Sequence, residues 1–270
     1  MKLNRVLLCL LAAATCSCFA QQAAAQRQPA PPAAQTKRPP QAKTQAEYAD
    51  YNAAYALSGG ASVEKAANEF AGKYPDSELK SFLFSKAMHE YQNENNPNKM
   101  LAMGEKVLAL DPDNTIALVL TATVLSDNLT DGDPARSAKI QTIKQNAARA
   151  LETVNTSFTP PAGTTPEQSA AYKKTLQSMA HAAVGIMNLK VNDDPGAERE
   201  LKLAAELNAT QPDAYIWYHL ALAQDHQKKY PEALASVEQA VKYAGANSEL
   251  APLAIAERDR LAKLAGAPAK

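Results

Sequence analysis

The sequence predicts an all-α protein built from repeated pairs of short helices. Alanine is abundant and only 10 of the 270 residues are glycine, a composition that favours helices. In Tyr215–Ala244, apolar residues recur at three- and four-residue spacing in two successive blocks, as on two amphipathic helices. An internal period supports repetition, because Leu118 follows Phe84 by 34 residues and Leu125 follows Tyr91 by the same interval.

The segment Tyr215–Ala244 shows the helix pair most clearly. Trp217, Leu220 and Ala221 fall on one face of its first helix, and a polar break at 227–229 predicts a tight turn. The second helix has an apolar face of its own, formed by Tyr230, Ala233, Leu234, Val237, Ala240 and Val241. The alanines in both faces predict that the two backbones approach closely.

This segment resembles the tetratricopeptide repeat (TPR). The matching positions are held by Trp217, Leu220, Ala221, Tyr230, Glu232, Ala233 and Ala240. The chain departs at Gln224, Val237 and Gly245, where the family usually has tyrosine, an aromatic residue and proline. The resemblance implies a right-handed α-solenoid of about five helix pairs plus a C-terminal capping helix. It also implies a non-enzymatic scaffold that binds a protein or peptide.

The repeat pattern covers residues 44–266. Approximate units are expected at 45–75, 77–112, 115–158, 165–210 and 212–244. Phe84, Met88 and Tyr91 match the repeat in the second unit, and Gly185 matches it in the fourth. A helix at 248–264 is expected to cover the last apolar face of the solenoid through Leu250, Leu253, Ala256, Leu261 and Leu264.

The connection between the third and fourth units departs from the repeat pattern. The insertion Ser126–Thr165 is rich in turn-forming residues and lengthens the third unit, and its role is not evident from the sequence. Thr165, Pro166 and Gln168 then form a capping-box pattern with proline at the first helical position. A long helix is therefore expected to begin at the end of the insertion.

The N-terminus predicts an export signal. Lys2 and Arg5 precede the apolar stretch Val6–Ala14, and Cys18-Phe19-Ala20 resembles a cleavage site, so residues 1–20 are expected to be removed. Cleavage after Ala25 is the alternative. The expected product is periplasmic or secreted, without an integral membrane span.

All three cysteines lie within this signal, so the mature chain is expected to lack disulfides. Cys16 raises the alternative of a membrane-anchored lipoprotein that acts in envelope assembly. The preceding residues, Ala13-Ala14-Thr15, depart from the usual lipoprotein pattern, which makes this the minority interpretation.

Residues 21–43 read as a disordered linker rich in proline, glutamine and alanine. All 28 acidic residues lie in 47–270, and six of the 28 basic residues precede Glu47. The later part therefore carries a net charge of 22 − 28 = −6. This balance argues against a nucleic-acid partner.

No motif predicts a catalytic, cofactor-binding or metal site. The acidic stretch at 127–133 lacks the third and twelfth ligands of a calcium loop. His219 and His226 would stand about 10 Å apart on one helix, too far for one metal ion. The remaining enzymatic alternative is a site in the insertion, for which Asp127, Lys139 and Lys144 supply no obvious constellation.

The TPR resemblance implies a concave face for the partner on the first helix of each pair. The corresponding residues are Phe82, Ser85, His89, Gln92, Ile116, Val119, Thr123, Ser126, Tyr215, Tyr218, Leu222 and Asp225. Those expected to bind a protein or peptide are Phe82, His89, Tyr215, Tyr218, Leu222 and Asp225. Tyr215 and Tyr218 are large aromatic side chains with a hydroxyl, which suits a binding hot spot. The alternative is that these residues pack against neighbouring repeats.

Overall fold

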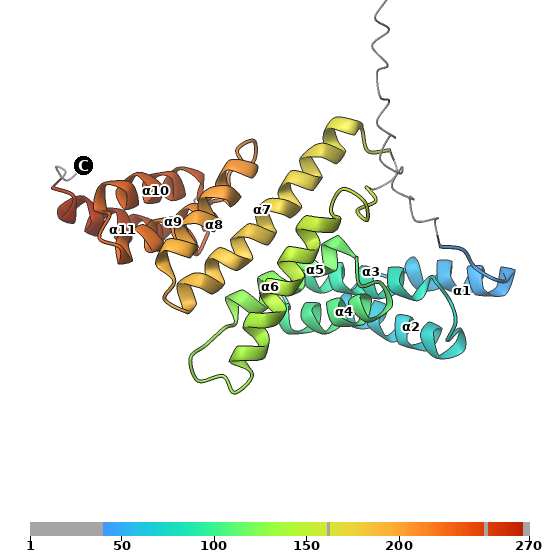
Figure 1. Cartoon of the computed structure of the whole chain (residues 1–270). Coiled ribbons are helices and arrows are strands. Elements are labelled where there is room, and N and C mark those ends of the chain that lie inside the picture. Colours follow the sequence, from blue (N-terminus) through green and yellow to red (C-terminus); the bar gives the residue numbers. More distant parts are fainter. Residues whose placement is uncertain (1–39, 161–162, 246–247, 267–270) are drawn as a thin grey trace, which may run out of the picture. The chain divides into compact units, whose positions relative to one another are not determined.

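The computed structural model describes residues 40–160, 163–245 and 248–266, which belong to one compact unit, Thr36–Lys270. The expected signal 1–20, both cleavage positions, Cys16 and most of the linker 21–43 lie outside the described residues. Within them the chain forms eleven helices and no strand, which confirms the all-α prediction (Figure 1).

The helices follow one another as pairs. The described elements are α1 (Gln45–Tyr55), α2 (Gly60–Lys73), α3 (Lys80–Asn93), α4 (Pro97–Leu110), α5 (Thr115–Asp127), α6 (Arg136–Thr153), α7 (Pro166–Lys190), α8 (Asp194–Leu207), α9 (Ala214–His226), α10 (Tyr230–Tyr243) and α11 (Leu250–Leu264). Each helix packs on the next along the chain, and the first helices of some neighbouring pairs also meet, most extensively α5 and α7 (Figure 1). This nearest-neighbour packing of helix pairs makes the domain an α-solenoid, as predicted.

Three of the pairs are joined by the same turn. Asn95, Asn192 and Lys228 adopt positive φ angles of 52°, 61° and 61°, and each is the second residue after its helix ends. The amide of the following residue donates to a carbonyl five residues back, at 2.9 Å in all three turns. This is the hydrogen bond of a Schellman motif, which ends a helix and reverses the chain.

The insertion interrupts this regularity between α5 and α6. Leu129, within the loop, is 3% exposed and packs with residues of α5, α6 and α7, so part of the loop belongs to the core. The expected capping box forms at the start of α7: the Thr165 hydroxyl accepts from the amide of Gln168 at 3.2 Å. The Gln168 side chain accepts from the amide of Thr165 at 2.9 Å.

Close contact within a pair depends on matching small and large residues. In the fourth pair Gly185 faces Leu201, and a Cβ at Gly185 would lie 2.6 Å from the Leu201 Cγ. Gly104 of α4 serves the contact with the next pair instead, because a Cβ there would lie 2.5 Å from the Thr121 Cγ2 of α5, whereas the Met88 Sδ of α3 is 3.4 Å away. At both glycines the helices can approach because one side chain is absent.

The departure from the TPR pattern at Gln224 has a structural reason. Gln224 is 3% exposed, and its side-chain carbonyl accepts from the Ser236 hydroxyl at 2.7 Å. Glu198 lies beside it and forms ion pairs with Lys202 and Lys229, each at 2.7 Å. A buried polar network therefore joins α8, α9 and α10 where the family would place a tyrosine.

The capping helix α11 packs differently from the expectation. Ala254 and Leu261 are its fully buried residues, and they pack on α9 and α10. Leu253 and Leu264, which the sequence pattern places in the buried face, are 55% and 46% exposed. The prediction of a capping helix is correct, but its buried stripe is narrower, because α11 packs on one side and no second helix of its own is described.

Candidate partner-binding face

The α3 part of the expected face is at the surface. Phe82 is 41% exposed although it is a large aromatic side chain. His89 and Gln92 are also exposed, and the His89 Nδ1 lies 3.3 Å from the Gln92 Oε1. The opposite side of α3, which includes Phe84 and Met88, is buried in the core of the first helices. One side of α3 is therefore exposed to solvent, and the packing of the other side fixes the position of the helix.

On α5 most of the residues expected to bind a partner pack inside the solenoid. Val119 is fully buried and packs with residues of α6 and α7, and Ser126 is also buried. Ile116 and Thr123 are half-buried, and the Thr123 hydroxyl donates to the Val119 carbonyl at 3.0 Å. Only the exposed parts of Ile116 and Thr123 therefore remain available on this helix.

Two of the four expected residues on α9 contact α11. Tyr218 is half-buried and packs on the cluster that contains Ala254 and Leu261. Asp225 forms an ion pair with Arg260 of α11. The alternative noted from the sequence, packing against a neighbouring element, therefore describes these two side chains.

Leu222 and Tyr215 are placed differently. Leu222 is half-buried against the cluster formed by α7, α8 and α9. Tyr215 is 38% exposed, and its hydroxyl donates to the Asp127 Oδ1 at 3.0 Å. We call Phe82, His89, Ile116, Thr123 and Tyr215 the candidate face, because each keeps exposed surface on a first helix.

A polar corner lies where α5, α7 and α9 meet. The Lys190 ammonium donates to the backbone carbonyl of Asp127, and the Arg136 guanidinium donates to the carbonyl of Lys190 at 2.5 Å. The rings of His219 and Tyr215 lie 4.2 Å apart, and the His219 Nδ1 is 2.9 Å from the Tyr215 carbonyl oxygen. No sequence pattern indicates this corner, because its members come from different units.

Burial shifts the pKa values of the groups in this corner towards their neutral forms. It raises the pKa of the Asp127 carboxyl, and the hydrogen bond from Tyr215 offsets this only in part. It lowers the pKa of the Lys190 ammonium and of the His219 imidazole, and it raises the pKa of the Tyr215 hydroxyl. The four groups therefore share a partly desolvated environment.

The residues considered for an enzymatic site in the insertion do not come together. Lys139 forms an ion pair with Asp133, and Lys144 is exposed on α6. Asp127 belongs instead to the polar corner with Tyr215. In the part of the chain that the structure describes, no group of three His, Cys, Asp or Glu side chains could hold a metal ion.

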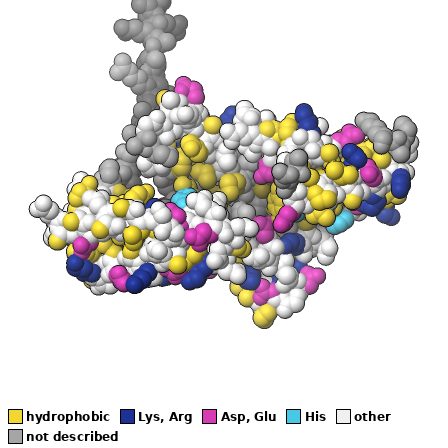
Figure 2. All heavy atoms as spheres, turned by 180° about the vertical axis from the view of Figure 1, so that it is seen from behind, with side chains coloured by type: hydrophobic (Ala, Val, Ile, Leu, Met, Phe, Trp, Pro, Cys, Tyr) yellow, Lys and Arg dark blue, Asp and Glu magenta, His cyan; other side chains and the backbone are white. Residues whose placement is uncertain are grey.

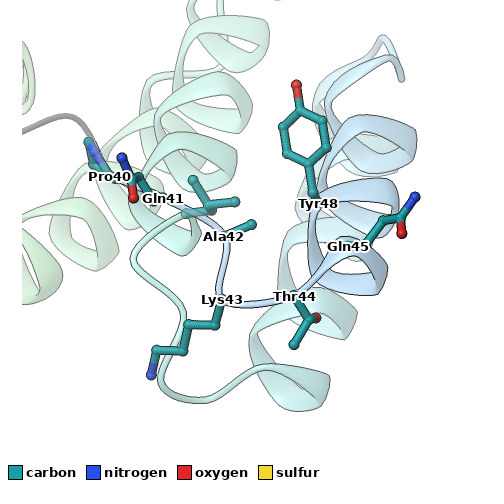
Figure 3. Close-up of a pocket in the computed structure, with 8 residues that line it drawn as sticks. Pro40, Gln41, Ala42, Lys43, Thr44, Gln45 and Tyr48 are labelled. Carbon is teal, nitrogen blue, oxygen red and sulfur yellow. The ribbon is translucent and has the colours of Figure 1, made fainter.

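The surface is hollowed in several places. Figure 2 shows one face of the molecule, on which hydrophobic side chains line a hollow near the middle of the view. A separate, open pocket of about 500 Å³ lies at the start of α1 (Figure 3), lined by Pro40, Gln41, Ala42, Lys43, Thr44, Gln45, Tyr48 and Leu79. Lys43 is the one charged residue among these lining side chains.

Comparisons with known proteins find similarity in the fold alone. No protein-family model matches the sequence, and no curated protein matches it significantly. Among solved structures, the fold is similar to the MamA protein, with 17% identity, a TM-score of 0.41, and 69% of this chain and 88% of that chain covered. It is also similar to TTC0263, a thermophilic TPR protein of Thermus thermophilus. There the identity is 14% and the TM-score 0.45, with 81% of this chain and 98% of that chain covered. Similarities of this size do not bear on function.

Among the described helices none is both long and apolar enough to cross a membrane.

Proposed function

We propose that this protein is a non-enzymatic scaffold that binds a protein or peptide along the candidate face. The observation that supports it most is Phe82, which is 41% exposed on a helix whose other aromatic residues, Phe84 and Tyr91, are buried. An exposed aromatic ring costs solvation free energy, and contact with a partner would recover it. Hydrophobic side chains also gather in the hollow seen in Figure 2.

The composition of the candidate face favours a peptide with apolar side chains. Phe82 and Ile116 offer apolar surface, and His89 offers an imidazole. The hydroxyls of Thr123 and Tyr215 already donate within the chain, so they can only accept hydrogen bonds from a partner. Such a mixture, with few charges, suits main-chain hydrogen bonds and apolar anchors rather than phosphate contacts. A nucleic-acid partner is therefore disfavoured, in agreement with the net negative charge of the domain.

The test compares two equally exposed side chains. Affinity capture from envelope extract would identify the partner, and its affinity would then be measured for Phe82→Ala and for Leu110→Ala. Leu110 is 42% exposed but lies at the end of α4, outside the candidate face. We expect Phe82→Ala to weaken binding at least tenfold, equivalent to about 1.4 kcal/mol, and Leu110→Ala to leave it unchanged. Equal effects of the two changes would refute the proposal.

We further propose that the protein is exported to the periplasm or secreted. The support is the charged start, the apolar stretch and the small residues at the cleavage site, all in residues 1–20. N-terminal sequencing of the exported protein should begin at Gln21 or, after the alternative cleavage, at Gln26. A chain that begins with a diacylated Cys16 would instead establish the lipoprotein.

A further inference from the structure

A hydrogen bond joins two helices whose pairs are not adjacent in the solenoid. The Tyr215 hydroxyl at the start of α9 donates to the Asp127 carboxylate at the end of α5, across 88 residues of sequence. Elsewhere α5 and α9 do not pack along their lengths, because α7 contacts both of them. The position of α9 relative to α5 is therefore set by packing through α7 and α8 and by this bond.

Both partners of the bond are held in place by other groups. The ring of Tyr215 lies 4.2 Å from the ring of His219, one turn further along α9. The backbone of Asp127 accepts from the Lys190 ammonium, which ties the end of α5 to the end of α7. Because the donor and the acceptor are already oriented, little conformational entropy is lost when the bond forms.

The surroundings strengthen the bond. Asp127 keeps exposed surface at the end of α5, yet desolvation raises the pKa of its carboxyl, which indicates that neighbouring groups exclude part of the water around it. A hydrogen bond to a carboxylate is stronger than one between neutral groups, and a partly desolvated setting strengthens it further. No ion pair involves the Asp127 carboxylate among the described residues, so the Tyr215 hydroxyl is its main partner.

We infer that Asp127 and Tyr215 form a clasp that holds α9 at a fixed distance from α5 and so sets the width of the candidate face. Tyr215 is then a positioning residue, because its hydroxyl acts inside the chain. The consequence for binding rests on the proposed function, but the clasp itself does not. Its role is to keep the helices before α7 and those after it from changing their separation freely.

The clasp can be tested by measuring distances between the two sides of α7. Spin labels would be placed on the exposed residues Ser62 of α2 and Ala235 of α10, with Cys9, Cys16 and Cys18 of the full chain replaced by serine. Tyr215→Phe removes only the hydroxyl, and Asp127→Ala removes the acceptor. We expect both to broaden the distance distribution measured by electron spin resonance.

Two further variants are matched controls. Asp127→Asn keeps an acceptor oxygen for Tyr215, and Tyr172→Phe removes a hydroxyl from an exposed tyrosine of α7 that is outside the corner. Both should keep the narrow wild-type distribution. A wild-type distribution in Tyr215→Phe and Asp127→Ala would overturn the clasp. If the distances broaden but Phe82→Ala leaves partner affinity unchanged, the clasp stands and the proposed binding face fails.

Discussion

At the scale of single residues, the pairing of small and large side chains decides how closely two helices approach. Gly185 makes room for Leu201 within the fourth pair, and Gly104 of α4 makes room for Thr121 of α5 in the next pair. The absence of a Cβ at one position makes room for a large side chain at the other.

Gly185→Ala should destabilise the fold. The new Cβ would lie 2.6 Å from the Leu201 Cγ and 3.3 Å from its backbone nitrogen, so the helices would have to move apart. We expect a loss of about 1–3 kcal/mol in the free energy of unfolding, measured by urea titration. Gly72→Ala is the matched control, because nothing lies within 4 Å of its Cβ position in α2. This change should stabilise the protein by about 0.5–1 kcal/mol, and a loss at both sites would contradict the steric argument.

Glu198 makes the stability of the fold depend on pH. Burial opposes its ionisation, but hydrogen bonds from Lys202, Lys229 and Gln227 outweigh burial and lower the pKa to about 2 from an ordinary value of 4.5. A carboxyl whose pKa is lowered on folding contributes stability above its unfolded pKa and loses it as the pH falls towards the folded value. Between pH 4.5 and 2 the stability of the wild type should therefore fall.

Glu198→Gln isolates this contribution. The amide cannot ionise, so the variant should be less stable than the wild type at about pH 7, and the difference should shrink as the pH falls from 4.5 to 2. Urea titrations at several pH values would measure it. Glu206→Gln, at an exposed position of the same helix, serves as the control. A difference that stays constant over this pH range would show that Glu198 acts by packing alone.

At the scale of elements, three turns share one backbone conformation although their sequences differ. Asparagine tolerates a positive φ, as at Asn95 and Asn192, whereas lysine at Lys228 does so at a cost. The Schellman hydrogen bond and the packing of α9 on α10 offset that cost. The polar sequence at 227–229 predicted a tight turn here but not its positive φ angle.

Lys228→Gly should relieve the strain. Glycine adopts a positive φ without steric penalty, and the Lys228 side chain is exposed at the turn. We expect stabilisation of about 0.5–1 kcal/mol in thermal or urea unfolding. Asn192→Gly, at the equivalent turn, should change stability less, because asparagine already tolerates this conformation. A destabilised Lys228→Gly would mean that the lysine side chain has a role of its own.

At the scale of the whole molecule, the solenoid is held together by contacts between successive helices. Each helix packs on its neighbours along the chain. A substitution that destabilises one end of the solenoid should therefore affect nearby helices more than distant ones. The last helix, α11, is attached through Ala254 and Leu261, both fully buried. Loss of the packing of α11 should therefore destabilise the C-terminal helices first.

Leu261→Ala should loosen the C-terminal end selectively. Truncation of a fully buried leucine costs about 2–5 kcal/mol where it cannot be compensated. Hydrogen exchange should then speed up in α10 and α11, while amides of α3 and α4 stay protected. Leu253→Ala, at a residue of the same helix that is 55% exposed, should leave exchange unchanged. A uniform rise in exchange over all helices would show that the domain unfolds as one unit.

Much of the architecture is already determined by the sequence. The alanine-rich composition, the spacing of Trp217, Leu220 and Ala221, and the 34-residue period predict an all-α array of helix pairs. These features are local, because helical periodicity and a repeat of fixed length are written in consecutive residues. The capping box at Thr165 and Gln168 is equally local, and it forms as predicted.

Only the tertiary structure determined which side of each helix remains exposed to solvent. Tyr215, Tyr218 and Asp225 share the same helical pattern, yet Asp225 binds Arg260, Tyr218 packs on α11, and Tyr215 reaches Asp127. The polar partners of Asp225 and Tyr215 lie 35 and 88 residues away, so no local spacing could identify them. The same holds for Gln224, whose network with Glu198 and Ser236 spans three helices. A residue's own sequence neighbourhood fixes its helix and its face, whereas long-range packing determines whether that face is free to bind.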